Sequence, residues 1–162
     1  MRETTAIPWL SEWAVLLPVP VVRRQRGADA EKPKIALMGF PVVHFEINSS
    51  GAPKLVRFYA DAFGWNIQQD GHGYADIRTE GVCAGSGEPG IDGGIGTAEP
   101  GDDFVTIYVQ VPDVQETLEK VLALGGNVEM PATEAGRVVM AIVRDPAGNR
   151  IGLVRAAPLA SA

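Results

Sequence analysis

The chain has 162 residues, of which 46% are hydrophobic and 21% charged, with a formal net charge of -6 and a pI near 4.9. This composition is typical of one globular domain, and the acidic balance argues against a nucleic-acid partner, whose phosphates are bound by clustered Lys and Arg. The single cysteine, Cys83, excludes an intrachain disulfide and fits a cytoplasmic location; we assign it no role.

Residues 1–37 differ in pattern from the rest of the chain. An apolar run interrupted by Pro18 and Pro20 is followed by a basic, polar stretch without helical or strand periodicity. A membrane span needs about 20 uninterrupted apolar residues, and a signal peptide carries its charge before its apolar stretch, so we expect neither, and no membrane partner. We expect a folded domain over residues 38–157, preceded by a disordered extension or an over-long start and followed by a tail, 158–162.

The domain opens with a strand, a helix and further short strands. Alternation over residues 41–47 predicts a strand with Val43, Phe45 and Ile47 on one face and His44 and Glu46 on the other. A helix is predicted over residues 48–64, with Ser49 or Ser50 as its N-cap and Gly64 as its end. Short strands are predicted at 66–70 and 74–78, and the glycine-rich stretch 91–96 gives a weaker strand signal.

The same order then repeats. Residues 103–111 alternate, with Val105, Ile107 and Val109 predicted to pack on a helix and Thr106 and Tyr108 predicted to face the other way. The following helix, 111–126, has Asp113 and Glu116 at capping-box spacing and ends at Gly125. Strands are predicted at 127–130, 137–143 and 150–154, the last two joined by a type I turn at Asp145, Pro146 and Gly148.

Equal spacing indicates a duplicated unit. The interval from His44 to Thr106 equals that from Gly64 to Gly126, so the strand centre and the helix end recur at the same distance. We therefore predict an α+β fold of paired βαβββ modules that form a curled mixed sheet. Each module buries one sheet face under its helix, and the remaining faces enclose a cup.

The cup holds the candidate site. By alternation, Ile151 and Leu153 face a helix, so Gly152 faces the cup and leaves space where a side chain would pack, unless a neighbour such as Met140 fills it. We predict that the residues around the cup bind a small molecule: His44, Glu46, Thr106, Tyr108, Met140, Arg150 and Gly152.

The order VVHFEI, LVRFYADAFGW, YVQVPDVQETLEKVLALGGNV and VRDPAGNRIGLV resembles the vicinal oxygen chelate superfamily, which includes glyoxalase I, extradiol dioxygenases, fosfomycin resistance enzymes and bleomycin-binding resistance proteins. The resemblance covers residues 39 to 156. It implies the glyoxalase/bleomycin resistance/dihydroxybiphenyl dioxygenase-like fold, and it implies a homodimer, since chains with one pair of modules commonly associate.

In the metal-dependent members of that superfamily, His or Glu ligands converge from four strands. Carried over by position, the ligands fall on His44, on Thr106, on Gly152 and around Asp92 or Gly93. Because threonine is a poor ligand and glycine none, we expect no metal at the superfamily's site and no cofactor. A displaced site of His44, Glu46 and His72, holding Fe, Mn, Ni or Zn, needs the turn that contains His72 to fold into the cup; otherwise His72 is an exposed turn residue.

These observations leave three functions open. The first is a metal-free binding protein of the bleomycin-resistance type that holds an aromatic or cationic molecule in the cup. The second is a glyoxalase-like lyase or isomerase, or a dioxygenase, that uses His44 with a relocated metal. The third is a domain for interaction only, with its cup filled by its own side chains.

The catalytic candidates are His44 and Glu46. A carboxylate neighbour raises the proton affinity of a histidine, and such a pair can perform acid-base chemistry without a metal. Alternatively, His44 is a lining residue that forms a hydrogen bond with Glu46 or Tyr108.

Overall fold

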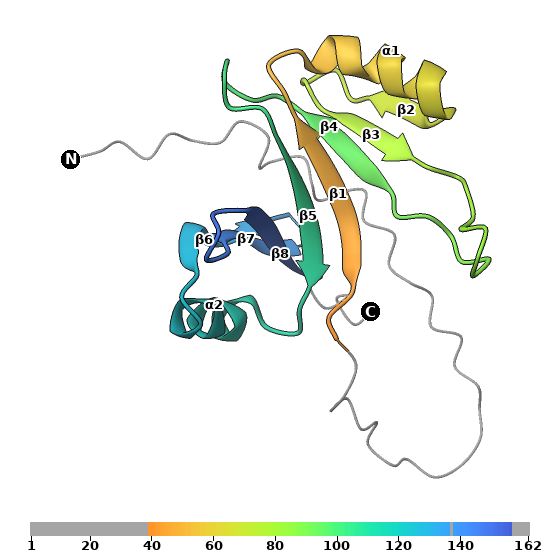
Figure 1. The fold of residues 1–162 in the computed structure, drawn as a ribbon. Helices are drawn as coiled ribbons and strands as arrows, with labels where there is room; N and C mark the ends of the chain where they lie inside the picture. Colours follow the sequence, from red (N-terminus) through yellow and green to blue (C-terminus); the bar gives the residue numbers. More distant parts are fainter. Residues whose placement is uncertain (1–38, 137, 157–162) are drawn as a thin grey trace.

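The structure, a computed structural model, describes residues 39–136 and 138–156 (Figure 1). The expectations for residues 1–37 and 158–162 lie outside the described residues. The first module contains β1 (Val42–Asn48), α1 (Ala52–Phe63), β2 (Asn66–Gln69), β3 (Ala75–Arg78) and β4 (Gly93–Gly96). The second contains β5 (Phe104–Gln110), α2 (Val114–Ala123), β6 (Asn127–Ala135), β7 (Val138–Arg144) and β8 (Arg150–Ala156).

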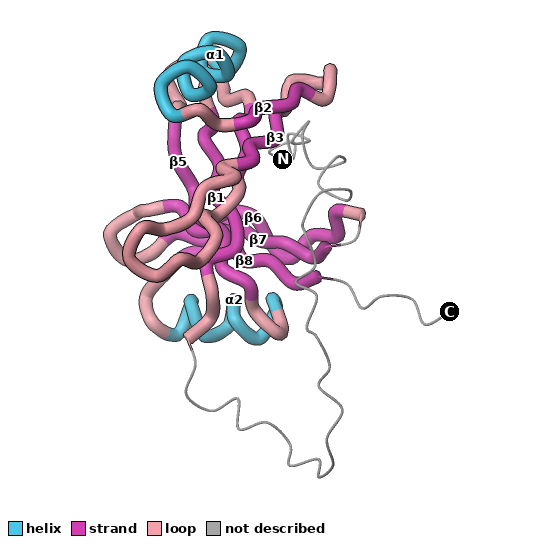
Figure 2. Tube along the Cα trace, turned by 90° about the vertical axis from the view of Figure 1, so that its right-hand side faces the viewer, coloured by secondary structure: helices cyan, strands magenta, loops and turns pink. Residues whose placement is uncertain are grey.

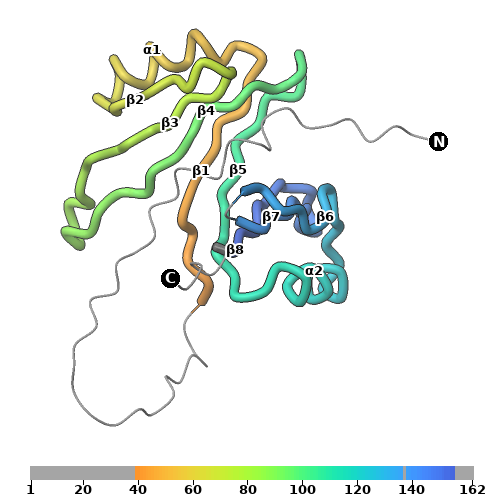
Figure 3. Tube along the Cα trace, turned by 180° about the vertical axis from the view of Figure 1, so that it is seen from behind, coloured from red at the N-terminus to blue at the C-terminus, as the bar shows by residue number. Residues whose placement is uncertain are grey.

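The strands form one mixed sheet of eight in the order β2-β3-β4-β1-β5-β8-β7-β6. The strand order is therefore the same within each module. The two modules are joined where β1 and β5 pair antiparallel. Within the modules, β1 pairs in parallel with β4, and β5 pairs in parallel with β8. The helices lie at opposite ends of the molecule (Figures 2 and 3). The predicted duplication is confirmed, and the weak glycine-rich strand proves to be β4, a direct neighbour of β1.

Each helix packs on the outer face of its own module. The cluster beneath α1 joins Leu55 and Tyr59 to Ile77 and Ile95 of the sheet. The cluster beneath α2 joins Val114 and Leu118 to Leu153, as the alternation in β8 predicts. Among the described residues, no helix is long and apolar enough to cross a membrane.

The two helices begin differently. Asp113 caps α2 by accepting a hydrogen bond from the Glu116 backbone N–H at 2.9 Å, as the sequence predicts. Helix α1 begins after Gly51 without a side-chain cap, so the prediction of a serine cap was wrong; Ser49 Oγ instead accepts from the Gly51 backbone N–H. Gly64 ends α1 in the left-handed conformation.

The outer face of β5 is less covered than predicted. Val109 packs in the cluster beneath α2, but Val105 is 63% exposed and Ile107 is 39% exposed. The cause is position: α1 packs against β4 and β2, and α2 against β6, β7 and β8, which leaves the centre of the sheet between them. Cross-strand pairing places Ile47 beside Val105. We call Ile47, Val105 and Ile107 the outer strip.

Candidate functional site

The inner face of the sheet, turned away from both helices, carries the polar residues that alternation predicts. His44 and Glu46 of β1 pair with Tyr108 and Thr106 of β5, and all four are buried. The aromatic ring of Tyr108 joins an apolar cluster with Met140 and other residues of the second module. The structure therefore brings the predicted strand residues together on one face.

Glu46 is the centre of a buried hydrogen-bond network. Its Oε2 accepts from Tyr108 Oη at 2.8 Å and from Asn48 Nδ2 at 3.0 Å. Only 1% of Glu46 is exposed, and this burial raises the pKa of its carboxyl to about 7, although the two hydrogen bonds act to lower it. The carboxyl therefore holds its proton to a higher pH than an exposed glutamate does.

His44 contacts two tyrosines. Its Nε2 lies 3.3 Å from Tyr74 Oη, and its ring meets the Tyr108 ring edge-on at 5.8 Å. Burial lowers the pKa of His44 to about 4, with a smaller opposing effect of Asp92. A neighbouring carboxylate, Asp92, does act to raise the pKa of His44, but the loss of hydration on burial outweighs this effect.

Two glycines make room for two tyrosines on the inner face. A Cβ at Gly152 on β8 would collide with the Tyr108 ring, and a Cβ at Gly94 on β4 would collide with Tyr74 Oη. Tyr74 thereby reaches across β4 to His44 on β1. Gly152 does face inward as predicted, but its space is filled by Tyr108 and not by Met140, so it does not open volume for a ligand.

The positions to which the superfamily's metal ligands map do not together carry a suitable set of donor atoms. The Tyr108 ring covers Gly152, and the inward residue of β4 is Gly94; a Cβ at Gly93 would meet Phe45 on the outer face. Asp92 accepts hydrogen bonds from Arg78 and Thr79. No three His, Cys, Asp or Glu residues in the described parts of the chain form a group that could hold a metal ion.

The donor set at this position therefore does not fit the metal. His72, the third member of the alternative site, is exposed in its turn, so the described residues do not assemble that site either.

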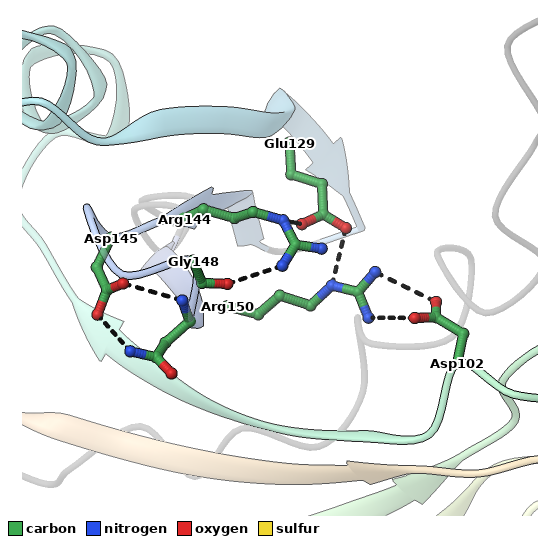
Figure 4. A network of polar contacts seen from close by, with 7 residues as sticks. Asp102, Glu129, Arg144, Asp145, Gly148 and Arg150 are labelled. Carbon is green, nitrogen blue, oxygen red and sulfur yellow. Dashed lines mark hydrogen bonds and ion pairs between the residues drawn. The ribbon is translucent and has the colours of Figure 1, made fainter.

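Arg150 and Met140 complete the predicted set of ligand-binding residues. Arg150 donates to both carboxylate oxygens of Asp102, at 3.3 and 3.2 Å, and to Glu129 at 2.9 Å (Figure 4). Its guanidinium also lies 4.0 Å from the centre of the Phe104 ring. Because these contacts use most of its N–H groups, a ligand would have to compete for Arg150. Met140 has no exposed surface. Ligand contact by these two residues stays a prediction.

Sequence reasoning missed three inward residues. Asn48 extends the alternation of His44 and Glu46 by one step and could have been included. Tyr74 directly precedes the four-residue strand β3, too short to show a period, and its contact with His44 depends on the glycine at 94. Asp76 pairs with Gly94, and burial raises the pKa of its carboxyl.

Comparison with known proteins agrees with the fold. The model of the Glyoxalase/Bleomycin resistance protein/Dioxygenase superfamily matches residues 42–153, and the chain belongs to this superfamily.

Two curated relatives and one solved structure illustrate the likeness. The "Putative glyoxylase CFP32" of Mycobacterium bovis is 31% identical over 110 residues, covering 62% of this chain and 40% of the relative, so the chain spans less than half of that protein. The lactoylglutathione lyase of Haemophilus influenzae is 27% identical over 126 residues, covering 70% of this chain and 90% of the relative. A superfamily member from Vibrio splendidus shares the fold, with a TM-score of 0.51 and 14% identity over 72% of this chain and 99% of that one.

Proposed function

We propose that this protein binds a small organic molecule, aromatic or cationic, on the inner face of its sheet, without a divalent metal and in the manner of the bleomycin-resistance branch of its superfamily. The observation that carries the proposal is a set of three buried polar atoms without a hydrogen-bond partner: Glu46 Oε1, Asn48 Oδ1 and Thr106 Oγ1. Burying a polar atom without a partner costs about 1–3 kcal/mol, so a ligand that supplies donors is stabilised there.

The pairing of Tyr74 with Gly94 and of Tyr108 with Gly152 supports the metal-independent form of the proposal. Tyr108 lies on β5, one of the strands to which the superfamily's ligand positions map, and the Tyr74 hydroxyl lies over Gly94 of β4, another of these strands. We also propose a homodimer, which is supported by the exposed outer strip. A cytoplasmic location remains part of the proposal.

A catalytic alternative has support of its own. One relative is named a lactoylglutathione lyase, and the Glu46 carboxyl, with a pKa of about 7, can exchange a proton at neutral pH. The metal-dependent form of this alternative requires His44 and ligands that the described residues do not bring together.

Two measurements on the full chain test the proposal. Plasma mass spectrometry of protein purified without chelator should find no stoichiometric Fe, Mn, Ni or Zn, in either the wild type or His44→Ala. Stoichiometric metal that disappears in His44→Ala would overturn the metal-free proposal and favour the catalytic alternative.

The second measurement is thermal stabilisation by a panel of small aromatic and cationic compounds. A ligand at 100 times its Kd should stabilise the fold by about 2.7 kcal/mol. If no compound in the panel raises the melting temperature, the domain fits the interaction-only function instead.

A further inference from the structure

Three unpartnered polar atoms lie close together on the inner face. Glu46 and Asn48 follow each other on the inward side of β1, and Thr106 of β5 is the direct cross-strand partner of Glu46. Each of the three residues is 1% exposed. Neighbouring side chains on one sheet face are within reach of a single small group.

The side-chain amide of Asn48 already donates to the Glu46 carboxyl. Asn48 donates through Nδ2 to Glu46 Oε2, which leaves Asn48 Oδ1 and Glu46 Oε1 as the unpartnered acceptors. Both oxygens lie near Gly96 of β4: a Cβ at Gly96 would overlap Asn48 Oδ1 and would lie 3.8 Å from Glu46 Oε1. Because Gly96 has no side chain, no side chain at this position of β4 occupies the space beside the two oxygens.

The charges of the inner face are unbalanced at this point. Arg78 is paired with Asp92 at 2.9 Å, and Arg150 with Glu129 and Asp102. In the described part of the chain, no basic side chain forms an ion pair with Glu46 within 4.0 Å, so its carboxyl is buried without a counter-charge. Asp76 on β3, two strands from β1 in the sheet, adds to the negative charge of the inner face. A buried carboxylate is costly unless a cation accompanies it.

We propose that Glu46 Oε1, Asn48 Oδ1 and Thr106 Oγ1 bind the primary ammonium group of a small organic cation. This inference rests on the proposed function and names its ligand class. A primary ammonium carries three N–H donors and no acceptor, which matches three oxygens that can all accept when Glu46 is ionised, and its charge supplies the missing partner of the Glu46 carboxylate. The three atoms have no exposed surface, so inner-face side chains must move for the ligand to enter.

The test uses the full chain and three probes of matched shape in titration calorimetry. Benzylammonium has charge and N–H donors, benzyltrimethylammonium has charge without N–H donors, and benzyl alcohol is neutral. We expect benzylammonium to bind at least about tenfold more tightly than either of the others, because hydrogen bonds to charged groups are the stronger ones.

Variants locate the site. Glu46→Gln keeps an acceptor oxygen for Tyr108 but removes the charge, and Thr106→Val removes the hydroxyl while keeping the shape; each should weaken benzylammonium about tenfold. Asp76→Asn is the matched control, since it neutralises an inward carboxyl but leaves the three oxygens intact, and it should change the Kd by less than about threefold. Circular dichroism confirms that each variant is folded.

The outcomes separate the inference from the function beneath it. If benzyl alcohol binds as tightly as benzylammonium, or if Glu46→Gln and Thr106→Val leave benzylammonium binding unchanged, the ammonium site is wrong and small-molecule binding stands. If no probe binds and the wider panel gives no stabilisation, the proposed function fails as well.

Discussion

Tyr108 and Gly152 form a coupled pair, because the ring lies where a side chain at 152 would be. We predict that Gly152→Ala destabilises the fold by about 1–3 kcal/mol, the usual cost of forcing an extra methyl group into a packed site. In a Tyr108→Ala background the same change should be close to neutral, since the obstacle is gone. Chemical denaturation of the four proteins of this double-mutant cycle measures the coupling, and additive effects would contradict it.

His44 and Glu46 have opposite effects on the dependence of stability on pH. Folded Glu46 keeps its proton up to about pH 7, whereas the carboxyl has a reference pKa of 4.5, so in this window the folded state binds more protons and stability falls as pH rises. Folded His44 loses its proton at about pH 4 instead of 6.5, so the unfolded state binds more protons and stability rises with pH.

These two effects nearly cancel in the wild type, and single variants should reveal them. Glu46→Gln retains only the effect of His44, so its free energy of unfolding should increase as pH rises from 4 to 6.5. His44→Asn retains only the effect of Glu46, so its free energy of unfolding should decrease as pH rises from 4.5 to 7. Each change should amount to about 3 kcal/mol. Urea denaturation across this pH range measures both, and parallel pH profiles for the two variants would refute the assignment.

Among the secondary-structure elements, α2 has the start that its sequence specifies. Asp113→Ala should reduce the free energy of unfolding by about 1 kcal/mol, because the backbone N–H of Glu116 loses its acceptor. Asp113→Asn is the control and should cost less than half as much, since asparagine caps a helix nearly as well. Thermal denaturation of both variants checks that Asp113→Ala loses more stability than Asp113→Asn. Equal losses would indicate that the charge of Asp113, and not its capping hydrogen bond, stabilises the helix.

The strands show how far sequence reasoning reaches. Period-two alternation placed His44, Glu46, Thr106 and Tyr108 on one face because side-chain direction along a strand is a local property. The filling of Gly152 by Tyr108 depends on the register between β5 and β8, which pair in parallel although 39 residues lie between them in the chain. Strand pairing of that kind leaves no local pattern, so the inward direction of Gly152 could be predicted and its neighbour could not.

The arrangement of the modules explains the one large error of pattern reading. Alternation in β5 correctly identified an apolar face, but a module has only one helix, and each helix lies toward an end of the sheet (Figure 1). At the centre, where β1 and β5 meet, Val105 and Ile107 of the outer strip are therefore exposed and Ile47 is half-buried. Alternation in the sequence predicts that a strand face is apolar, but it does not predict whether another part of the same chain covers that face.

We predict that a second copy of the chain covers the outer strip, because an exposed apolar face at the centre of a sheet is stabilised by burial against a partner. Sedimentation velocity on the full chain should show a dimer, and Ile107→Glu should shift it toward monomer, since the introduced carboxylate would be buried without a partner. Val82→Glu is the matched control: Val82 is 72% exposed in the loop after β3, outside the strip, and its substitution should leave the dimer intact. A wild-type chain that sediments as a monomer, or an equal effect of both variants, would place the contact elsewhere.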